Sequence, residues 1–313
     1  MPIPAEFTQY LRTIELPKPN SHKGQNGKVM VIGGSELFHA ASQWALTVVS
    51  RMVDMTFYSS IPSNNELIHE AKKHFHNGIV VPRDEIENYI DEAEVVLIGP
   101  GMERGKNQDT RNKIQTKNNN LTTQQHNYFS KPTDEQWNDN TEAITNYLLS
   151  KYPNKKWVID AGALQMIDPK LLNKNCIITP HIGEFETVMK KIDGNFDIKA
   201  WSKKLNSVSR SLNLPPSTTL LKGPTDYILS STYYIPVSGG NVGMTKGGTG
   251  DVLAGLVAGL YCFTNDPFSA AVIGSYVNKK AGDELYKTVG PFFNATDLAN
   301  QIPQTLAEVF DFV

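Results

Sequence analysis

Residues 247–251 read Gly-Gly-Thr-Gly-Asp and are followed by residues 252–260, a run without a single polar side chain. Glycines let the backbone turn sharply and approach a ligand closely, and the apolar run has the composition of a buried helix. The first amides of a helix have no partner within it and carry partial positive charge from the helix dipole. We therefore predict that the amides of Thr249, Gly250 and Asp251 bind a phosphate group, with the Asp251 carboxylate beside it.

An aspartate at the start of a helix also has a purely structural interpretation. As an N-cap it would contribute about 1 kcal/mol of stability and no chemistry. The flanking glycines and a predicted hairpin before them favour an active-site loop instead. Other motifs fail on spacing, because residues 99–105 are one residue too long for the dinucleotide fingerprint and neither Gly27-Lys28 nor Gly105-Lys106 is followed by Ser or Thr. The seven histidines lack metalloenzyme spacing, so we predict no metal site built from protein ligands.

Short apolar runs alternate with longer segments of helical period, which is the pattern of parallel strands covered by helices. A buried strand is predicted at residues 28–32, ending at Gly33-Gly34, with a helix over 40–52. Further strands are predicted at 55–59, 95–98, 157–160, 176–179 and 218–222, followed by a hairpin of 227–231 and 233–237 and then three helices. In an open parallel sheet the ligand site lies outside the carboxyl ends of the strands, so we expect function there.

Composition limits the class of protein. With 313 residues, 40% of them hydrophobic, the chain can bury a large core as one α/β domain over residues 1–313. One polar segment, at about residues 105–140, is predicted to be an insertion or mobile loop, because it has too little apolar surface to offset its ordering entropy. Phe129 and Trp137 within this segment would allow it to dock as a lid.

The formal net charge of -2 argues against a nucleic-acid or membrane-surface partner, since either would usually require a basic face. Cys176 and Cys262 both lie in apolar runs and are predicted to be reduced core thiols. The N-terminus has no basic or apolar signal region, and no stretch approaches the ~20 apolar residues of a membrane span. We therefore expect a cytoplasmic protein with a small-molecule substrate.

Four segments occur in an order that resembles one known family. They are Gly-Gly-Thr-Gly-Asp-Val-Leu-Ala-Gly at 247–255, Thr-Pro-His-Ile-Gly-Glu at 179–184, Ile-Gly-Pro-Gly at 98–101, and residues 28–35. From about residue 20 to its end, the chain resembles the ADP- or ATP-dependent NAD(P)H-hydrate dehydratase family. The resemblance implies a ribokinase-like three-layer α/β/α sandwich, with a mostly parallel central sheet and an antiparallel hairpin near the C-terminal third. About 20 residues precede the first motif, so we expect the epimerase domain often fused to this dehydratase to be missing.

The resemblance also implies an activity. The family repairs NADH and NADPH that have gained water, using ADP or ATP to phosphorylate the added hydroxyl, which then leaves as phosphate. Asp251 would be the base, and the loop 247–250 would be the anion hole, with the amides of Gly248, Thr249 and Gly250 holding the phosphoryl group. Mg2+ is expected to enter with the nucleotide, held through phosphate oxygens and water. A homo-oligomer is expected from the family as well.

By the same resemblance, further residues match binding positions. The nucleotide-binding residues would be Lys222, Gly223, Pro224, Thr225, Asp226, Asn241, Gly248, Thr249 and Gly250, and the substrate-binding residues would be Ala40, Gly99, Gly101, His181 and Asp251. For His181 the alternative is a cap on the helix that starts near Glu184, and for Asn241 it is a simple turn residue.

Four positions depart from the family pattern. They are His39 in place of glycine, Met102-Glu103 in place of small residues, Gly162 in place of a second aspartate, and Asp226 in place of threonine. Two other functions therefore stay open: a small-molecule kinase of the same fold, which would keep the phosphate in its product, and a non-catalytic nucleotide-binding protein. The sequence does not distinguish ATP from ADP, or the NADH hydrate from the NADPH hydrate.

Overall fold

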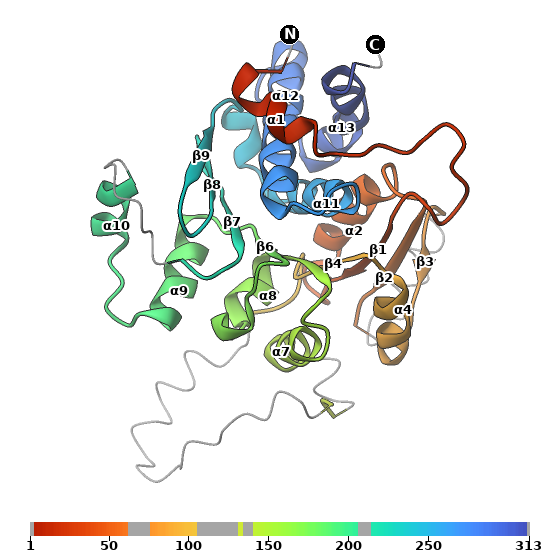
Figure 1. Ribbon diagram of the computed structural model, residues 1–313, viewed down its shortest axis with the longest axis vertical. Helices are drawn as coiled ribbons and strands as arrows, with labels where there is room; N and C mark the ends of the chain where they lie inside the picture. Colours follow the sequence, from red (N-terminus) through yellow and green to blue (C-terminus); the bar gives the residue numbers. More distant parts are fainter. Residues whose placement is uncertain (1–2, 62–75, 105–130, 134–139, 206–213, 312–313) are drawn as a thin grey trace.

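The computed structural model describes residues 3–61, 76–104, 131–133, 140–205 and 214–311. Within them the chain forms one nine-stranded sheet in the order β3-β2-β1-β4-β5-β6-β7-β8-β9 (Figure 1). Neighbouring strands from β3 to β7 are parallel, whereas β7, β8 and β9 pair in an antiparallel manner. The bounds are β1 Lys28–Ile32, β2 Met55–Ser59, β3 Ile79–Val80, β4 Val95–Ile98, β5 Lys156–Ile159, β6 Cys176–Ile178, β7 Thr218–Leu221, β8 Asp226–Leu229 and β9 Tyr234–Val237.

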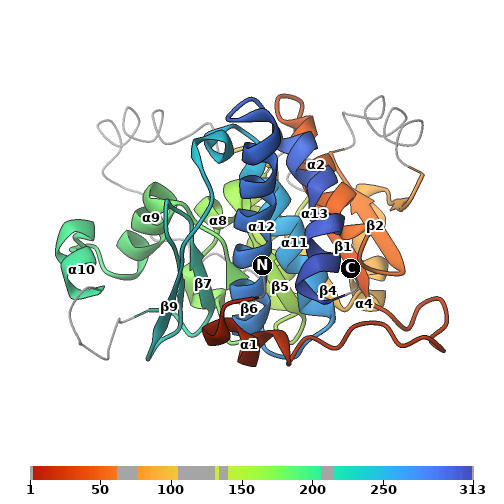
Figure 2. The ribbon, with the colours of Figure 1, turned by 90° about the horizontal axis from the view of Figure 1, so that it is seen from above.

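Helices cover both faces of the sheet because successive side chains of a strand point to opposite faces. In β1, Val29 and Val31 belong to one buried apolar cluster, and Met30 and Ile32 belong to another. The first cluster includes side chains of α1 Ala5–Leu11, α2 His39–Val49, α11 Thr249–Cys262, α12 Pro267–Val289 and α13 Ala295–Val309. The second includes side chains of α4 Ile86–Glu92, α7 Thr141–Lys151, α8 Ala161–Met166 and α9 Ile182–Ile192. The result is a three-layer arrangement (Figure 1), and the view from above shows α11, α12 and α13 lying over the sheet (Figure 2).

A third, smaller cluster lies at the β8–β9 end of the sheet. There Phe185 of α9 stacks against Trp201 of α10 Ile198–Leu205, with ring centroids 4.7 Å apart. Short 3-10 turns complete the secondary structure at η2 Arg83–Glu85, η3 Pro169–Leu171 and η4 Val242–Thr245.

The predicted fold class is confirmed, and the predicted core strands match the observed ones to within a residue or two at their ends. The N-terminal helix α1 and the edge strand β3, which has only two residues, were not predicted. Helices α4, α7, α8 and α10 were expected only in general, as helices between strands, and not placed by residue. Almost all of the predicted insertion at 105–140, with Phe129 and Trp137, lies outside the described residues, so the lid and the extent of the domain stay predictions. No helix in the described part of the chain is both long and apolar enough to cross a membrane.

Candidate active site

The glycine loop joins the hairpin to the buried helix α11, as its composition predicts. Gly248 is the N-cap of α11 and has φ 95°, a left-handed conformation that favours glycine. A Cβ atom added to Gly248 would lie 2.3 Å from the Trp44 ring, so the residue must be small as well. Thr249 closes the loop from within, because its hydroxyl donates to the carbonyls of Met244 at 2.7 Å and Lys246 at 2.9 Å.

Backbone donors at this turn are left without partners. The Thr249 amide makes a long contact of 3.4 Å with the Lys246 carbonyl. No described residue accepts a hydrogen bond from the amides of Gly247, Gly248 or Gly250. These amides lie at the N-terminal end of a 14-residue helix, where the dipole favours an anion. The arrangement suits a phosphoryl group.

Asp251 lies in the first turn of the same helix and is partly buried. Burial and the nearby Asp160 carboxylate raise the pKa of its carboxyl group and the Lys222 ammonium lowers it, and the net result is a pKa of about 7. A carboxyl group with a pKa near neutrality can accept a proton and release it again, which is the property of a general base.

Lys222 lies between two acidic side chains at the carboxyl edge of the sheet. Its Nζ lies 2.9 Å from Asp160 Oδ1 and 4.0 Å from Glu184 Oε2. Burial alone would lower the pKa of Lys222, but the carboxylates of Asp160 and Glu184 outweigh burial and raise it. A Cβ atom added to Gly250 would lie 3.3 Å from this Nζ, so the ammonium is adjacent to the glycine loop. Lys222 therefore adds a positive charge beside the unpaired amides.

His181 is the N-cap of α9. Its Nδ1 accepts hydrogen bonds from the amides of Gly183 at 3.1 Å and Glu184 at 3.3 Å, and the Glu184 carboxylate accepts one from the His181 amide at 3.0 Å. His181 therefore caps α9, as the structural alternative predicts. The side chain is still 54% exposed, so one edge of the ring remains accessible.

The segment after Lys222 forms the turn between β7 and β8. Gly223 and Pro224 are exposed and Thr225 is partly so, but Asp226 is buried. The Asp226 carboxylate accepts hydrogen bonds from the Gly223 amide at 2.9 Å and the Ser275 hydroxyl at 2.7 Å.

Lys279 neutralises Asp226. Its Nζ lies 3.4 Å from Asp226 Oδ1 and donates to the carbonyls of Gly223 and Pro224, at 3.0 Å and 3.1 Å. Asp226, which stands where the family pattern has threonine, is therefore buried and paired and adds no uncompensated charge beside the turn.

Asn241 is also held by the protein. Its side-chain oxygen accepts from the Gly243 amide at 2.9 Å, and its side-chain nitrogen donates to the Gly282 carbonyl at 2.9 Å and to Asp283 at 3.1 Å. The turn alternative thus describes the observed contacts of Asn241.

The glycines of the Gly-Pro-Gly turn are buried against neighbouring backbone. A Cβ atom on Gly99 would lie 1.8 Å from the Asp160 carbonyl, and one on Gly101 would lie 2.2 Å from the Phe38 carbonyl. Gly99 therefore allows β5 to bring Asp160 into the site. Ala40 is partly exposed in the first turn of α2, and His39 beside it is exposed.

Two departures from the family pattern are in contact with each other. A Cβ atom on Gly162 would lie 2.1 Å from the Met102 carbonyl, so no larger side chain fits there. The backbone at residue 102 therefore leaves no room for an aspartate at residue 162.

The structure brings Lys222, Gly250 and Asp251 together, and it adds two acidic residues that the sequence prediction did not include, Asp160 and Glu184. Asp160 is 1% exposed and Glu184 is 4% exposed. The available signal was their position, because Asp160 ends one predicted strand of the parallel sheet and Glu184 follows another.

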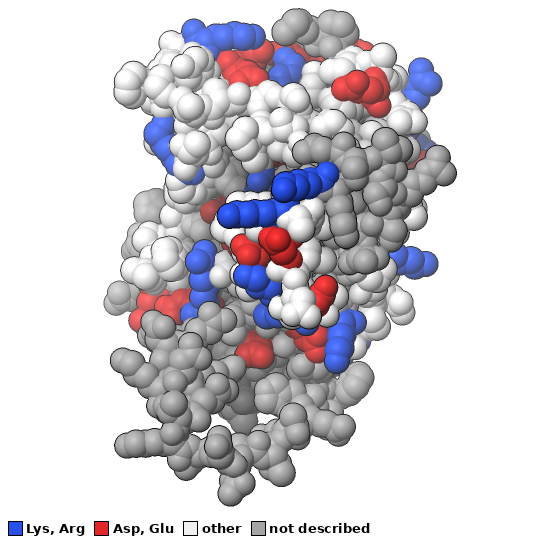
Figure 3. Space-filling view, turned by 90° about the vertical axis from the view of Figure 1, so that its left-hand side faces the viewer, with Lys and Arg blue, Asp and Glu red and all other residues white. Residues whose placement is uncertain are grey.

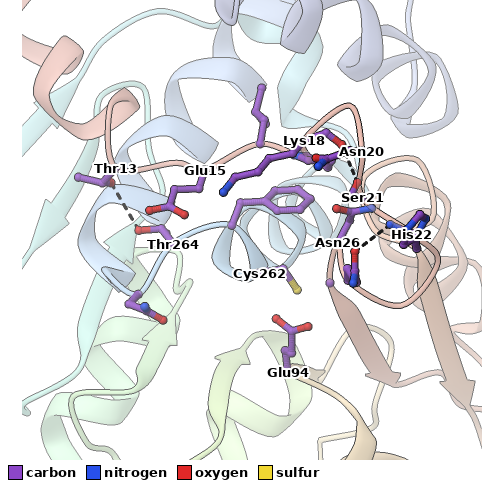
Figure 4. Close-up of a pocket in the computed structure, with 16 residues that line it drawn as sticks. Thr13, Glu15, Lys18, Asn20, Ser21, His22, Asn26, Glu94, Cys262 and Thr264 are labelled. Atoms are coloured by element: carbon purple, nitrogen blue, oxygen red, sulfur yellow. Dashed lines mark hydrogen bonds between the residues drawn. The ribbon is translucent and has the colours of Figure 1, made fainter.

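A separate pocket of about 600 Å3 lies far from Asp251. It is lined by residues that precede β1 and β4, such as Gly27 and Glu94, and by Cys262 at the C-terminal end of α11 (Figure 4). Because α11 rises about 1.5 Å per residue, its two ends are roughly 20 Å apart. This pocket is at the opposite edge of the sheet from the glycine loop.

Basic and acidic side chains are interspersed among the described residues of the face drawn in Figure 3.

Comparisons with known proteins show the family of the chain. The sequence model of a family described as NAD(P)H-hydrate dehydratase matches residues 133–304. The ADP-dependent (S)-NAD(P)H-hydrate dehydratase of Nitrosopumilus maritimus is 30% identical over 94% of this chain and 93% of its own length. The bifunctional NAD(P)H-hydrate repair enzyme Nnr of Methanocaldococcus jannaschii is 33% identical over 95% of this chain, which spans only 51% of that relative.

A solved structure supports the fold. The ADP/ATP-dependent NAD(P)H-hydrate dehydratase from Bacillus subtilis, co-crystallised with ATP and Mg2+, has a TM-score of 0.65 at 20% identity and covers 97% of both chains. The sheet order and the glycine loop that opens α11 define a ribokinase-like α/β protein. Within that class, the chain belongs to the NAD(P)H-hydrate dehydratase family.

Proposed function

We propose that the chain dehydrates hydrated NADH or NADPH at the expense of ADP or ATP. The observation that carries the proposal is the arrangement at the start of α11, where Asp251, with its pKa raised to about 7, lies one residue from the unpaired Gly250 amide and near the Lys222 ammonium. A base and a set of anion-binding donors are the two parts that phosphoryl transfer to a hydroxyl requires.

The reaction has two steps. The Asp251 carboxylate takes the proton of the added hydroxyl, and the hydroxyl oxygen forms a bond to the terminal phosphorus of the nucleotide as the bond to the leaving phosphate oxygen breaks. The amides of Gly247, Gly248 and Gly250 and the ammonium of Lys222 neutralise the transferring group. In the second step the carbon–oxygen bond breaks and the oxygen leaves with the phosphate. The adjacent ring carbon loses a proton to solvent, and the double bond of the nicotinamide ring is restored.

Binding roles are proposed for the other residues. The exposed turn of Gly223, Pro224 and Thr225 would contact the nucleotide, while Asp226 and Asn241 hold this turn and the glycine loop in place. Ala40 and the accessible edge of His181 would contact the hydrated cofactor. Gly99 and Gly101 would shape that side of the site. The Thr249 amide would join the anion hole only by giving up its contact with the Lys246 carbonyl.

Mg2+ would accompany the nucleotide and neutralise charge on its phosphates. The described residues contain no group of three His, Cys, Asp or Glu side chains placed to hold a metal ion. We therefore propose that phosphate oxygens and water supply its ligands. A homo-oligomer and a cytoplasmic location are parts of the same proposal.

The test is to incubate the protein with hydrated NADPH, Mg2+ and either ADP or ATP, and to follow the absorbance of the reduced cofactor. We expect the absorbance to return and Asp251→Asn to lower turnover by about 10²–10⁴-fold, the usual contribution of a general base. Asp193→Asn serves as the matched control, because Asp193 is exposed at the end of α9 and Asn keeps its acceptor oxygen.

Three other outcomes would contradict the proposal in different ways. A phosphorylated product that persists would indicate a kinase of the same fold. Nucleotide binding without turnover, unchanged in Asp251→Asn, would indicate a non-catalytic protein. Wild-type turnover by Asp251→Asn would show that the base is another residue.

A further inference from the structure

Asp160 has no role in the proposed chemistry so far, although it is the most buried acidic residue near Asp251, at 1% exposure. A buried carboxylate must be paired or hydrogen-bonded, because it has lost its hydration. Asp160 Oδ1 accepts two hydrogen bonds, from the Thr179 hydroxyl at 2.8 Å and from Lys222 Nζ at 2.9 Å. The second of these bonds is the only ion pair that the structure gives Asp160 among the described residues.

The neighbouring carboxylate, Glu184, is satisfied differently. Its oxygens accept hydrogen bonds from neutral groups, the Gln165 amide nitrogen at 2.9 Å and the His181 backbone amide at 3.0 Å. Lys222 Nζ is 4.0 Å from Glu184, more than an ångström farther than from Asp160. Asp160 therefore determines where the ammonium lies.

The backbone around Asp160 is constrained for this placement. Ala161, the next residue, has φ 45°, which an L-amino acid rarely adopts. Strain of this kind persists where the surrounding structure fixes a functional residue. On the other side, the Asp160 amide donates to the Ile98 carbonyl at 3.0 Å, and the Asp160 carbonyl packs where Gly99 has no side chain.

The position of Lys222 matters because a second anion is close to it. Asp251 interacts electrostatically with Lys222, and lysine is a flexible side chain that can pair with either carboxylate. If Asp160 did not hold the Lys222 ammonium, the ammonium would pair with Asp251. That pair would stabilise the ionised carboxylate and oppose its uptake of a proton.

We propose that Asp160 is a positioning residue of this active site: it holds the Lys222 ammonium beside Gly250, where a phosphoryl group would bind, and keeps it from pairing with Asp251. The inference rests on the proposed function for its catalytic consequence, but the placement of the charges can be tested without turnover.

The groups that face Asp251 are Asp160 at the end of β5, Glu184 on α9 and Lys222 after β7. Replacing Asp160 with asparagine removes a negative charge that raises the pKa of Asp251. It also frees the Lys222 ammonium, whose positive charge lowers that pKa. Both changes act in the same direction, so the carboxyl group of Asp251 should titrate at least about one pH unit lower. In Lys222→Gln the charge that lowers the pKa is lost, so titration should move to higher pH.

The experiment is a carbon-detected NMR titration of the Asp251 carboxyl group in the full-length, nucleotide-free protein, for wild type, Asp160→Asn, Lys222→Gln and Thr179→Val. Thr179→Val is the matched control, because it removes the other donor to the same Asp160 oxygen and leaves every charge in place. We expect a lower midpoint in Asp160→Asn, a higher one in Lys222→Gln, and the wild-type midpoint in Thr179→Val. Loss of packing alone would not move the two charge variants in opposite directions.

A midpoint in Asp160→Asn that stays at the wild-type value or rises would overturn the proposal. If Asp160→Asn does not fold, an unchanged or lower midpoint in Lys222→Gln would overturn it as well.

In the repair assay, the acid limb of kcat/KM should follow the same shifts. Asp160→Asn should also bind ADP about tenfold more weakly, as expected from displacing a charged hydrogen-bond donor. A wild-type protein with the expected titrations but no repair would contradict the proposed function and leave the positioning role intact.

Discussion

At the scale of the residue, the site is defined by opposing effects on one carboxyl group. Burial and Asp160 make the ionised form of Asp251 unfavourable, and Lys222 makes it less so. A carboxylate in water has a pKa of about 4 and is a weak base at neutral pH, so this environment gives Asp251 a basicity it would lack on the surface.

The raised pKa predicts a pH-dependent stability. Because the pKa of Asp251 is about 7 in the folded protein and 3.8 ordinarily, its contribution to the free energy of unfolding is present at low pH and is lost as pH rises through about 7. Asparagine does not titrate. Asp251→Asn should therefore be more stable than wild type above pH 7, with the difference shrinking toward about pH 4. Urea unfolding across this pH range measures it, and a difference that does not depend on pH would show that the carboxyl group is not perturbed.

At this scale the sequence indicated features that depend on neighbouring residues, such as a turn that leaves backbone amides unpaired. It did not indicate ion pairs whose partners come from distant segments. The unpaired amides follow from glycines that precede an apolar helix. In contrast, the pairing of Asp226 with Lys279 joins residues 53 positions apart, and the Asp160–Lys222 pair joins residues 62 apart. No local pattern encodes such contacts, and only the arrangement of strands in the sheet shows which carboxylates meet.

At the scale of the element, the start of α11 depends on a single left-handed residue. Gly248 combines φ 95° with the Trp44 ring beneath it, whereas an added Cβ on Gly247 would meet no atom within 4 Å. Two adjacent glycines of one loop therefore have different requirements.

Gly248→Ala should destabilise the protein, by roughly 1–2 kcal/mol for the left-handed backbone and by roughly 1–3 kcal/mol for the overpacking against Trp44. Gly247→Ala should stay within about 0.5 kcal/mol of wild type. Thermal unfolding of the two variants measures these two changes in stability. Equal changes would mean that the loop has a different conformation.

Elements were predicted well where they are buried. The core strands are short apolar runs bounded by glycine or polar residues, which is a strong local signal. The two-residue strand β3 was missed because its pairing with β2, not its own composition, makes it a strand. Helix α1 was missed because only Phe7 of its seven residues is buried, so it shows little amphipathic period.

At the scale of the whole molecule, the candidate active site and the described pocket lie at opposite ends of the strands. The glycine loop, Lys222 and Asp251 lie at the carboxyl edge, and the pocket of about 600 Å3 lies at the other end of α11. This pocket is thus not where the chemistry is expected.

This separation predicts that the double variant Glu15→Gln/Glu94→Gln, which removes two carboxylates that line the distant pocket, keeps wild-type kcat and KM in the repair assay. The charges are too far from Asp251 to act on it through solvent at physiological ionic strength, where screening extends about 8 Å. A change of tenfold or more in kcat would mean that the two edges are coupled.

In the proposed reaction the added hydroxyl is phosphorylated, with Asp251 as the base, and its oxygen leaves with the phosphate. The most direct measurement uses hydrated NADPH that carries a heavy oxygen isotope in the added hydroxyl, with mass analysis of the inorganic phosphate. We expect wild-type protein to transfer the label to phosphate and Asp251→Asn to do so about 10²–10⁴-fold more slowly. Label released into water instead would contradict it.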